Sequence, residues 1–371
     1  MTYKKSATYF LIIVIICTSF LPIVNISIGI FENTLSFNDN KKKLFSTDKC
    51  ESYLNYVVYK LFNKSLVEKN VIAGRDNFLF LGNGFNNVLK KTQGIDRPSK
   101  TEIDKWSDKL KFLQQQYESK GIKFIIVIAP NKESVYKDKL PSGMNYNGKT
   151  ITDDIVESAL NKNINMLDLR SLLEKEKYSN NELLYFKTDT HWNMKGASLG
   201  FESTINFIND TYKINIEKLH YTLQLSSRGG GDLTRFLKIK DLLSSTYDND
   251  FSLIFEKNIE VCKGNINKDN GSLEKCFDTP NPITDINAQP QYIINKGLKG
   301  YRLLLLCDSF GVAPSQLYNA SFNTIWKWHY DQLNGEKLSK FIDDNKPDIV
   351  IYQIIERALY DWKSMELPIV N

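Results

Sequence analysis

Histidine is scarce in this sequence. Only three occur among 371 residues, so chemistry that depends on an imidazole has few possible positions. Five scattered cysteines are too few to form a disulfide scaffold. Concentrated positive charge is also lacking, because the net charge of +5 comes from 48 Lys and Arg against 43 Asp and Glu. We therefore expect no nucleic-acid partner. The 42% of hydrophobic and 25% of charged residues exclude a wholly disordered chain.

Charged residues are absent from Ser6 to Phe31, and much of this stretch is aliphatic. A helix needs roughly 20 apolar residues to cross a bilayer, so the stretch is long enough. Lys4 and Lys5 precede it, as in an export signal. No small-residue cleavage motif is evident after it, which favours an uncleaved signal anchor over residues 1–31 above a cleaved signal peptide. We expect a single-pass membrane protein whose body lies outside the cytoplasm.

The rest of the sequence alternates between two patterns. Residues 32–70 are expected to form a juxtamembrane linker and one helix, and residues 71–371 the main domain. Continuous apolar runs predict strands that are covered on both faces, at Lys123–Pro130, Asn163–Leu169, Tyr301–Cys307 and Asp348–Ile355. Helical periodicity lies between them, at Ser99–Lys120, Asp153–Asn161, Asn193–Asn209 and Lys337–Asn345. This alternation predicts a doubly wound α/β fold around a parallel sheet.

Residues 238–300 are rich in Asn, Asp, Lys and Ser and show weak periodicity. We expect a loop-rich insertion there. It contains Cys262 and Cys276, which could pair in an oxidising compartment or remain as two thiols.

A serine follows the most apolar of the predicted strands. Leu303–Leu306 leads into Cys307, Asp308 and Ser309, and Gly311 comes shortly after. A serine on a sharp turn after a strand exposes its hydroxyl where backbone N–H groups can stabilise an oxyanion. The alternative is that Asp308 or Ser309 simply caps a helix.

One histidine has an acidic neighbour. His191 lies two residues after Asp189, just before a predicted helix, and an ordered carboxylate can hold an imidazole so that its other nitrogen acts as a base. The alternatives are a buried structural histidine or a metal ligand. A metal site is not predicted, because no second His cluster supplies further ligands. With Ser309, this pair would supply a nucleophile, a base and an orienting acid.

An ordered series of motifs extends over roughly residues 71–360. Its most distinctive members are Asp189-Thr-His-Trp192 and the later Asp308-Ser-Phe310. The other members are Gly74–Leu81, Ile128–Tyr136 with Leu140-Pro141, Gly196-Ala197, Gly231-Asp-Leu233 and Ile355-Glu-Arg357. This series resembles the SGNH hydrolase-like domain of the alginate O-acetyltransferase family, AlgJ and AlgX, and the first two motifs are the ones most specific to it.

The resemblance implies a flavodoxin-like, three-layer α/β sheet of the membrane-anchored AlgJ type. It implies that Ser309 is the nucleophile, His191 the base and Asp189 the orienting acid. The implied activity is transfer of acetyl groups to an exported polysaccharide without a cofactor. The implied partner is a multispanning membrane-bound O-acyltransferase that supplies the acetyl group. Cys307 departs from the glycine that the family often has there, and its side chain is expected to point into the sheet.

The sequence leaves three functions open: the acetyltransferase, an SGNH-type esterase that releases acetyl groups to water, and a non-catalytic anchored subunit. Lys132, Arg357 and Tyr330 are candidate substrate-binding residues. Lys132 and Arg357 could contact an acidic sugar or the active-site loop, with a salt bridge or a solvated charge as the alternatives, and Tyr330 could stack on a sugar ring. Trp192 is expected to pack in the core behind His191.

Overall fold

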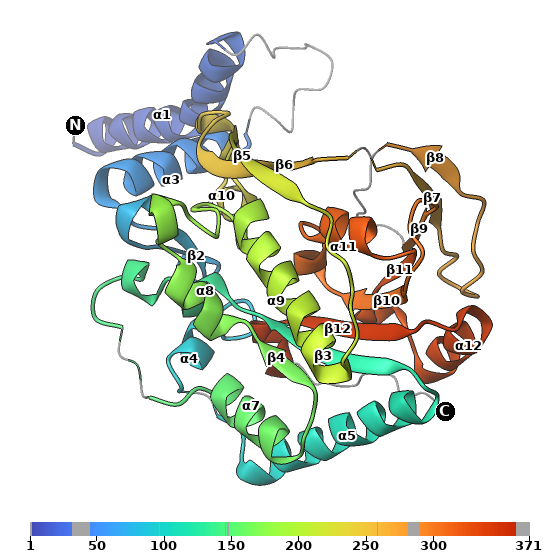
Figure 1. The fold of residues 1–371 in the computed structure, drawn as a ribbon. Coiled ribbons are helices and arrows are strands. Elements are labelled where there is room, and N and C mark those ends of the chain that lie inside the picture. Colours follow the sequence, from blue (N-terminus) through green and yellow to red (C-terminus); the bar gives the residue numbers. More distant parts are fainter. Residues whose placement is uncertain are drawn as a thin grey trace.

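The computed structural model describes residues 2–31, 45–95, 97–144, 146, 148–257, 259–280 and 290–360 (Figure 1). Its α-helices are α1 (Thr2–Phe31), α3 (Asp48–Phe62), α4 (Val88–Thr92), α5 (Lys100–Ser119), α6 (Lys132–Val135), α7 (Ile151–Asn161), α8 (Arg170–Glu176), α9 (Met194–Tyr212), α10 (Asp232–Phe236), α11 (Ser315–Ser321) and α12 (Gly335–Asn345). Its strands are β1 (Val71–Ala73), β2 (Leu79–Leu81), β3 (Lys123–Ala129), β4 (Met166–Asp168), β5 (Tyr221–Arg228), β6 (Asp248–Phe255), β7 (Val261–Asn265), β8 (Phe277–Thr279), β9 (Gln291–Asn295), β10 (Arg302–Cys307), β11 (Thr324–His329) and β12 (Ile349–Ile355). The 3-10 helices η5 (Ser309–Gly311) and η7 (Glu356–Tyr360) follow β10 and β12.

One eight-stranded sheet organises the body, in the order β4-β3-β12-β10-β11-β9-β7-β8. In the order of the sheet, the five neighbouring strands β4, β3, β12, β10 and β11 are parallel to one another. Four of them, β3, β4, β10 and β12, form at the four predicted apolar runs. Ring contacts place α5 and α12 on one face, where Tyr117 stacks on Phe124 and Phe341 packs against Trp328. Helices α9 and α11 lie on the other side (Figure 1), which gives the three layers that were expected.

The sheet is mixed rather than wholly parallel, because β9, β7 and β8 pair antiparallel at one end. The predicted loop-rich insertion at 238–300 is therefore wrong in part, since it carries β6 to β9. Antiparallel strands can leave one face in water, so polar residues are compatible with them and hide the strand pattern. Strand β6 pairs with β5 in a separate two-stranded ladder, whose last pair is Arg228 and Asp248.

Local capping residues mark the ends of the helices. Ser99 caps α5 in a capping box with Glu102, and Gly121 just beyond the helix has a φ of 75°. Left-handed backbone of this kind suits a residue without a side chain. Asn193 caps α9 by accepting a hydrogen bond from the Gly196 N–H at 3.1 Å.

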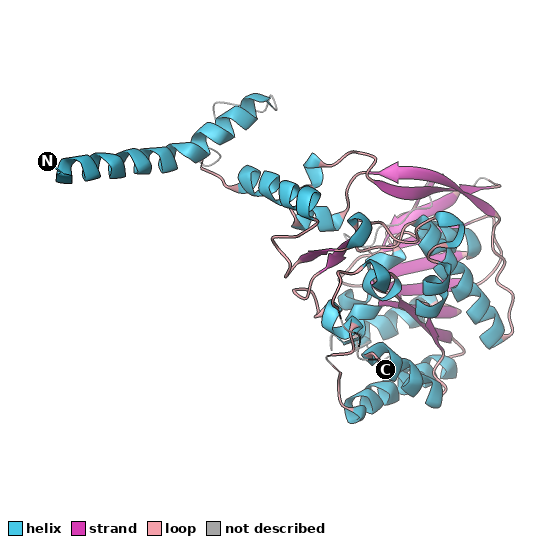
Figure 2. Cartoon of the chain, turned by 90° about the vertical axis from the view of Figure 1, so that its left-hand side faces the viewer, coloured by secondary structure: helices cyan, strands magenta, loops and turns pink. Residues whose placement is uncertain are grey.

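One helix is long and apolar enough to cross a membrane, over Thr8–Ser27 within α1. Figure 2 shows α1 projecting from the body, with α3 between the two. Most of the predicted juxtamembrane linker, residues 32–44, lies outside the described residues. The predicted helix before residue 70 is α3.

The sequence left the state of two cysteines open, and the structure joins them. Cys262 on β7 and Cys276 just before β8 form a disulfide, with 5.4 Å between their Cα atoms. The disulfide links β7 to the start of β8 at the antiparallel end of the sheet.

This disulfide predicts a measurable contribution to stability. Replacing Cys262 and Cys276 together with Ala should lower the free energy of unfolding by about 3 kcal/mol, because an uncrosslinked unfolded chain regains the entropy of a closed loop of this length. Urea unfolding of the full chain in detergent, followed by tryptophan fluorescence, measures the change. A matched Cys50→Ala variant, which removes a free thiol, should leave the midpoint nearly unchanged. An equal midpoint for the double variant and the wild type would contradict the prediction.

Candidate active site

Ser309 stands on a tight turn at the carboxyl end of β10. The turn is formed by η5, and the Asp308 carboxylate accepts the N–H groups of Phe310 at 2.9 Å and Ile355 at 2.7 Å. Gly311 is required here, because a Cβ atom at that position would lie 2.3 Å from Cys307 Sγ. The turn therefore presents Ser309 at the edge of the sheet, where ligands of open α/β sheets gather.

Cys307 lies beneath this turn and is fully buried. Burial raises the pKa of its thiol to about 12, so the thiol stays neutral and unreactive near neutral pH. As expected, its side chain points into the protein, and Ser309 is the candidate nucleophile.

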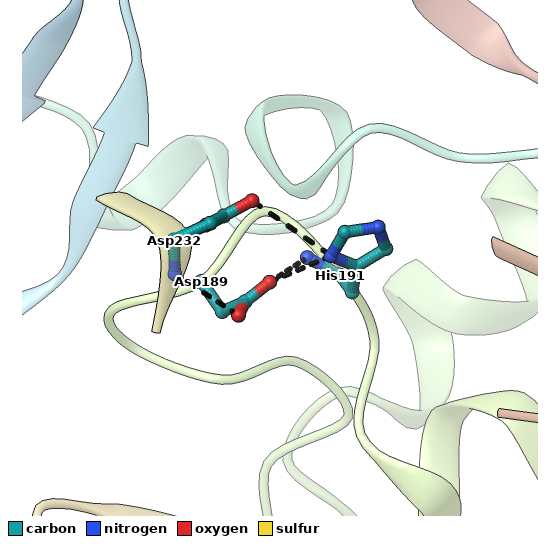
Figure 3. Close-up of side chains that lie close together, drawn as sticks. All are labelled: Asp189, His191 and Asp232. Atoms are coloured by element: carbon teal, nitrogen blue, oxygen red, sulfur yellow. Dashed lines mark hydrogen bonds and ion pairs between the residues drawn. The ribbon is translucent and has the colours of Figure 1, made fainter. Parts of the chain in front are cut away.

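His191 connects Ser309 to Asp189. Its Nε2 lies 2.8 Å from Ser309 Oγ, and its Nδ1 lies 2.7 Å from Asp189 Oδ1. The same carboxylate oxygen also accepts the His191 backbone N–H at 3.0 Å. The structure thus brings together the three residues that the sequence singled out, in a continuous chain of hydrogen bonds. Figure 3 shows that the carboxylates of Asp189 and Asp232 lie on the same side of the His191 ring, the side of Nδ1.

Asp189 is buried, yet its surroundings favour the charged form. Burial alone would raise the pKa of its carboxyl. Hydrogen bonds from His191 and the positive charge of Arg228 outweigh burial and hold that pKa far below its usual range. Arg228 Nη2 lies 2.5 Å from Asp189 Oδ2, and the backbone N–H of Asp232 donates to the same oxygen at 3.1 Å. A charged Asp189 orients the imidazole with Nδ1 as donor, which leaves Nε2 to accept the Ser309 proton.

The loop that carries Asp189 is held from both sides. On one side, the buried Lys132 ammonium donates to the carbonyls of Phe186 at 3.2 Å, Lys187 at 3.2 Å and Asp189 at 2.7 Å. On the other side, the buried Asp248 carboxylate accepts the N–H of Lys187 at 3.0 Å and the hydroxyl of Thr188. The loop therefore has partners for its buried polar backbone groups without regular secondary structure.

Two predicted substrate-binding residues are corrected by this geometry. Lys132 is 1% exposed, so its side chain is not open to a substrate. It contacts the active-site loop instead, which was the other role that the sequence suggested for it. Tyr330 is also buried, and its hydroxyl donates to Asp308 Oδ2 at 3.3 Å while its ring packs edge-on against Tyr352. Neither side chain is open to a sugar ring.

Arg357 is the remaining candidate of that group. It is half-buried, and its guanidinium carbon lies 5.7 Å from the centre of the Phe310 ring, beside Ser309. Its Nη1 donates to Asn131 Oδ1 at 3.3 Å. Arg357 therefore borders the turn that carries the serine.

Trp192 packs behind the histidine, as predicted. It is 2% exposed, and its indole N–H donates to the Phe310 carbonyl at 3.1 Å. Because Trp192 follows His191 and Phe310 follows Ser309, this bond ties the two segments of the candidate site together. The rings of His191 and Phe310 also lie 4.8 Å apart.

Reasoning from the sequence missed the contributions of Arg228, Asp232 and Asp248. Asp232 Oδ2 lies 3.8 Å from His191 Nδ1, and its carboxylate accepts the N–H of Thr190 at 2.8 Å and its hydroxyl at 2.6 Å. The motif Gly231-Asp-Leu233 was a usable signal for Asp232. Gly231 is needed because a Cβ atom there would lie 2.4 Å from Asp189 Cβ.

Asp189, His191 and Asp232 could also be considered as metal ligands, since their ligand atoms lie within 4.8 Å of one another (Figure 3). The lone pairs of the two carboxylates already accept hydrogen bonds. Asp189 accepts from His191 and Arg228, and Asp232 accepts from Thr190. The donor set fits a hydrogen-bonded acid–base group better than a cation site.

Comparison with known proteins identifies the family of the domain. The sequence model of the SGNH hydrolase-like domain of acetyltransferase AlgX matches residues 71–261, more than half of the chain. The chain belongs to this family. The matched region includes the Asp189 and His191 loop of the AlgX-family domain and ends before Ser309.

Individual relatives are more distant. The probable alginate O-acetylase AlgJ of Pseudomonas fluorescens is 24% identical over 193 residues, which cover 50% of this chain and 45% of that protein. The chain thus matches less than half of the length of this curated relative. PatB1 of Bacillus cereus has a similar structure, with a TM-score of 0.55 and 18% identity over 78% of this chain and 96% of PatB1. A DHHW family protein from Eubacterium siraeum has a TM-score of 0.54 and 17% identity over 81% of this chain and 99% of that one. The structural likenesses show the fold of the AlgX-family domain.

The contacts of Lys132 predict a structural role that can be tested. Lys132→Met should lower the free energy of unfolding by about 3 kcal/mol, because it leaves buried carbonyls without donors. Urea unfolding of the full chain measures this loss. Lys175→Met, at an exposed position of α8, is the matched control and should change it little. A Lys132→Met protein as stable as this control would refute the role.

The depressed pKa of Asp189 predicts a specific pH dependence of stability. Its ionised form contributes stability above the unfolded pKa of about 3.9, and this contribution is lost as the pH falls through the folded pKa. The wild type should therefore exceed Asp189→Asn in free energy of unfolding at about pH 5, and this excess should shrink as the pH falls below about 4. Urea unfolding at a series of pH values measures the difference. An excess that keeps growing below about pH 4 would contradict the assignment, and Asp210→Asn at an exposed position of α9 serves as the control.

Proposed function

We propose that this chain is an O-acetyltransferase that moves acetyl groups onto hydroxyls of an exported polysaccharide through an acetyl-serine intermediate. The observation that carries the proposal is the hydrogen-bonded chain of Asp189, His191 and Ser309 in a domain of the AlgX family. The name of the relative, a probable alginate O-acetylase, supports the same reaction class.

In the first half of the reaction, His191 Nε2 removes the proton from Ser309 Oγ as the oxygen attacks the carbonyl carbon of an acetyl donor. The charge of Asp189 stabilises the imidazolium that forms. The tetrahedral oxyanion needs N–H donors close to Ser309. In the described part of the chain, the N–H groups of Phe310 and Gly311 bond to Asp308, whereas that of Ser309 has no such acceptor. The Ser309 N–H is therefore the first candidate donor. The oxyanion then collapses, and the donor leaves with the proton from His191.

In the second half, a sugar hydroxyl attacks the acetyl-serine while His191 Nε2 accepts its proton. The new tetrahedral intermediate expels Ser309 Oγ, which recovers the proton from the imidazolium. No cofactor enters either step. Water in place of the sugar hydroxyl would make the same residues an esterase, so exclusion of water and the shape of the acceptor site separate the two outcomes. Arg357, at the border of the serine turn, is the side chain we assign to contact with the acceptor.

The cellular setting follows from the apolar helix and the family. We assign α1 as a single-pass anchor, with the catalytic body outside the cytoplasmic membrane, where an exported polysaccharide is accessible. We assign the acetyl supply to a multispanning membrane-bound O-acyltransferase, because an extracytoplasmic enzyme needs an acetyl group delivered across the bilayer.

Removal of the candidate nucleophile is the first test. Ser309→Ala should reduce acetyl transfer from a p-nitrophenyl ester to an oligosaccharide by about three orders of magnitude or more, since loss of the nucleophile removes the covalent route. Product formation is followed by mass spectrometry of the oligosaccharide. In the wild type, peptide mapping after rapid quenching should find the acetyl group on Ser309.

Ser321→Ala, at a half-buried position of α11, is the matched control and should retain activity. Unchanged transfer by a folded Ser309→Ala protein would exclude the mechanism. Rapid release of acetate that no oligosaccharide acceptor reduces would favour the esterase instead.

A further inference from the structure

The body covers helix α3 on one side only. The covered face contains Asn55 and Tyr59, which are 7% and 2% exposed. Asn55 Nδ2 donates to the Leu237 carbonyl at 2.9 Å, and the Tyr59 hydroxyl donates to the Asn77 carbonyl at 3.1 Å. These contacts fix the orientation of α3 on the body.

The opposite side of α3 carries Leu54, Val57 and Leu61, which we call the outer face. They are spaced three and four residues apart, and at about 100° per residue they share one side of the helix. Their exposed fractions are 55%, 43% and 73%. A contiguous exposed apolar surface of this kind marks an interaction site, and the position of α3 decides what covers it.

We propose that the outer face of α3 lies in the surface of the lipid bilayer, as a second membrane contact that orients the catalytic body. The proposal rests on the membrane location given above, because it takes α1 as the anchor. The candidate span ends at Ser27, and α3 begins at Asp48, so α3 is the first described helix after it. Figure 2 shows α3 at the end of the body from which α1 projects.

The charges of α3 are arranged as a bilayer surface requires. Lys64 is exposed just beyond the C-terminal end of the helix, where its long side chain can reach anionic headgroups. Lys60 turns toward the body, where its ammonium donates to the Tyr247 hydroxyl at 3.3 Å. Asp48 and Glu51 also lie toward the body, since they pair with Lys238 at 2.8 Å and 2.6 Å. The outer face is therefore left apolar, as in helices that lie in the interface.

A second contact has a mechanical consequence. A single span holds the body near the membrane but leaves it free to tilt. An immersed outer face would restrict that motion, because α3 is fixed to the body through Asn55 and Tyr59 and to the bilayer through the opposite side.

Spin labels on the full chain test the proposal without measuring acetyl transfer. In a Cys17→Ser, Cys50→Ser background, Leu54→Cys or Leu61→Cys carries a nitroxide, and the protein is reconstituted in phosphatidylcholine–phosphatidylglycerol vesicles. Relaxation by oxygen and by a water-soluble nickel chelate measures immersion. The ratio of oxygen to nickel accessibility should be several-fold higher at both positions than at Lys340→Cys, an exposed control on α12.

A label at Ile16→Cys in α1 reports on the anchor. If this label is not immersed, the premise fails and the proposal falls with it. Ratios at Leu54→Cys and Leu61→Cys equal to that at Lys340→Cys would also overturn it. Protection that is seen only in native membranes would mean that a protein, not lipid, covers the face.

A charge variant gives a second readout. Leu54→Glu combined with Leu61→Glu should leave the fold intact, because both side chains point away from the body. In that variant, a label at Val57→Cys should become as accessible to the nickel chelate as the control label. A Val57→Cys label that stays immersed would contradict the role of these leucines. Loss of acetyl transfer with normal immersion would count against the proposed reaction and not against this contact.

Discussion

The 2.8 Å contact between His191 Nε2 and Ser309 Oγ joins residues that are 118 positions apart in the chain. The two partners are positioned by different means. Ser309 follows a central, fully buried strand, whose backbone is fixed by ladders on both sides. His191 stands on a loop of bends, where no ladder fixes the backbone. A displacement of about 1 Å is enough to break a hydrogen bond of this length and to slow catalysis strongly, so the site depends on how that loop is held.

The loop is held by charges that are buried beside it. The Lys132 ammonium faces its carbonyl groups, and the Asp248 carboxylate faces its N–H groups. Burial lowers the pKa of Lys132 and raises that of Asp248, so each is costly to bury alone. Their hydrogen bonds to the loop offset this cost, because a buried polar group is stable when it is paired. Asp248 and Arg228 form the last pair of the β5–β6 ladder, so this one ladder positions both the loop and its key carboxylate, Asp189.

Sequence patterns predicted the parts of the structure that depend on neighbours in the chain. The apolar runs located the parallel strands, and helical periodicity over Ser99–Lys120 located α5. Asp189 and His191 were recognised because they are two residues apart. The environment of Lys132 was not predictable in the same way, because its carbonyl partners are more than 50 residues away. Arg228 had no local signal at all, and the antiparallel strands β7 to β9 were hidden because they are short and polar residues interrupt their apolar positions.

The same long-range contacts decide how the imidazole can act. Two carboxylates lie near His191 Nδ1, at 2.7 Å for Asp189 and 3.8 Å for Asp232. The Asp232 carboxylate already accepts the backbone N–H and the hydroxyl of Thr190. The Nδ1 proton of His191 is therefore directed to Asp189. Arg228 stabilises the charge of Asp189, which opposes transfer of that proton to the carboxylate. The proton therefore stays on Nδ1, and the lone pair of Nε2 points at Ser309. In the reaction proposed above, this arrangement would let His191 accept a proton from the serine and return it, while Asp232 would add negative charge near the cationic ring.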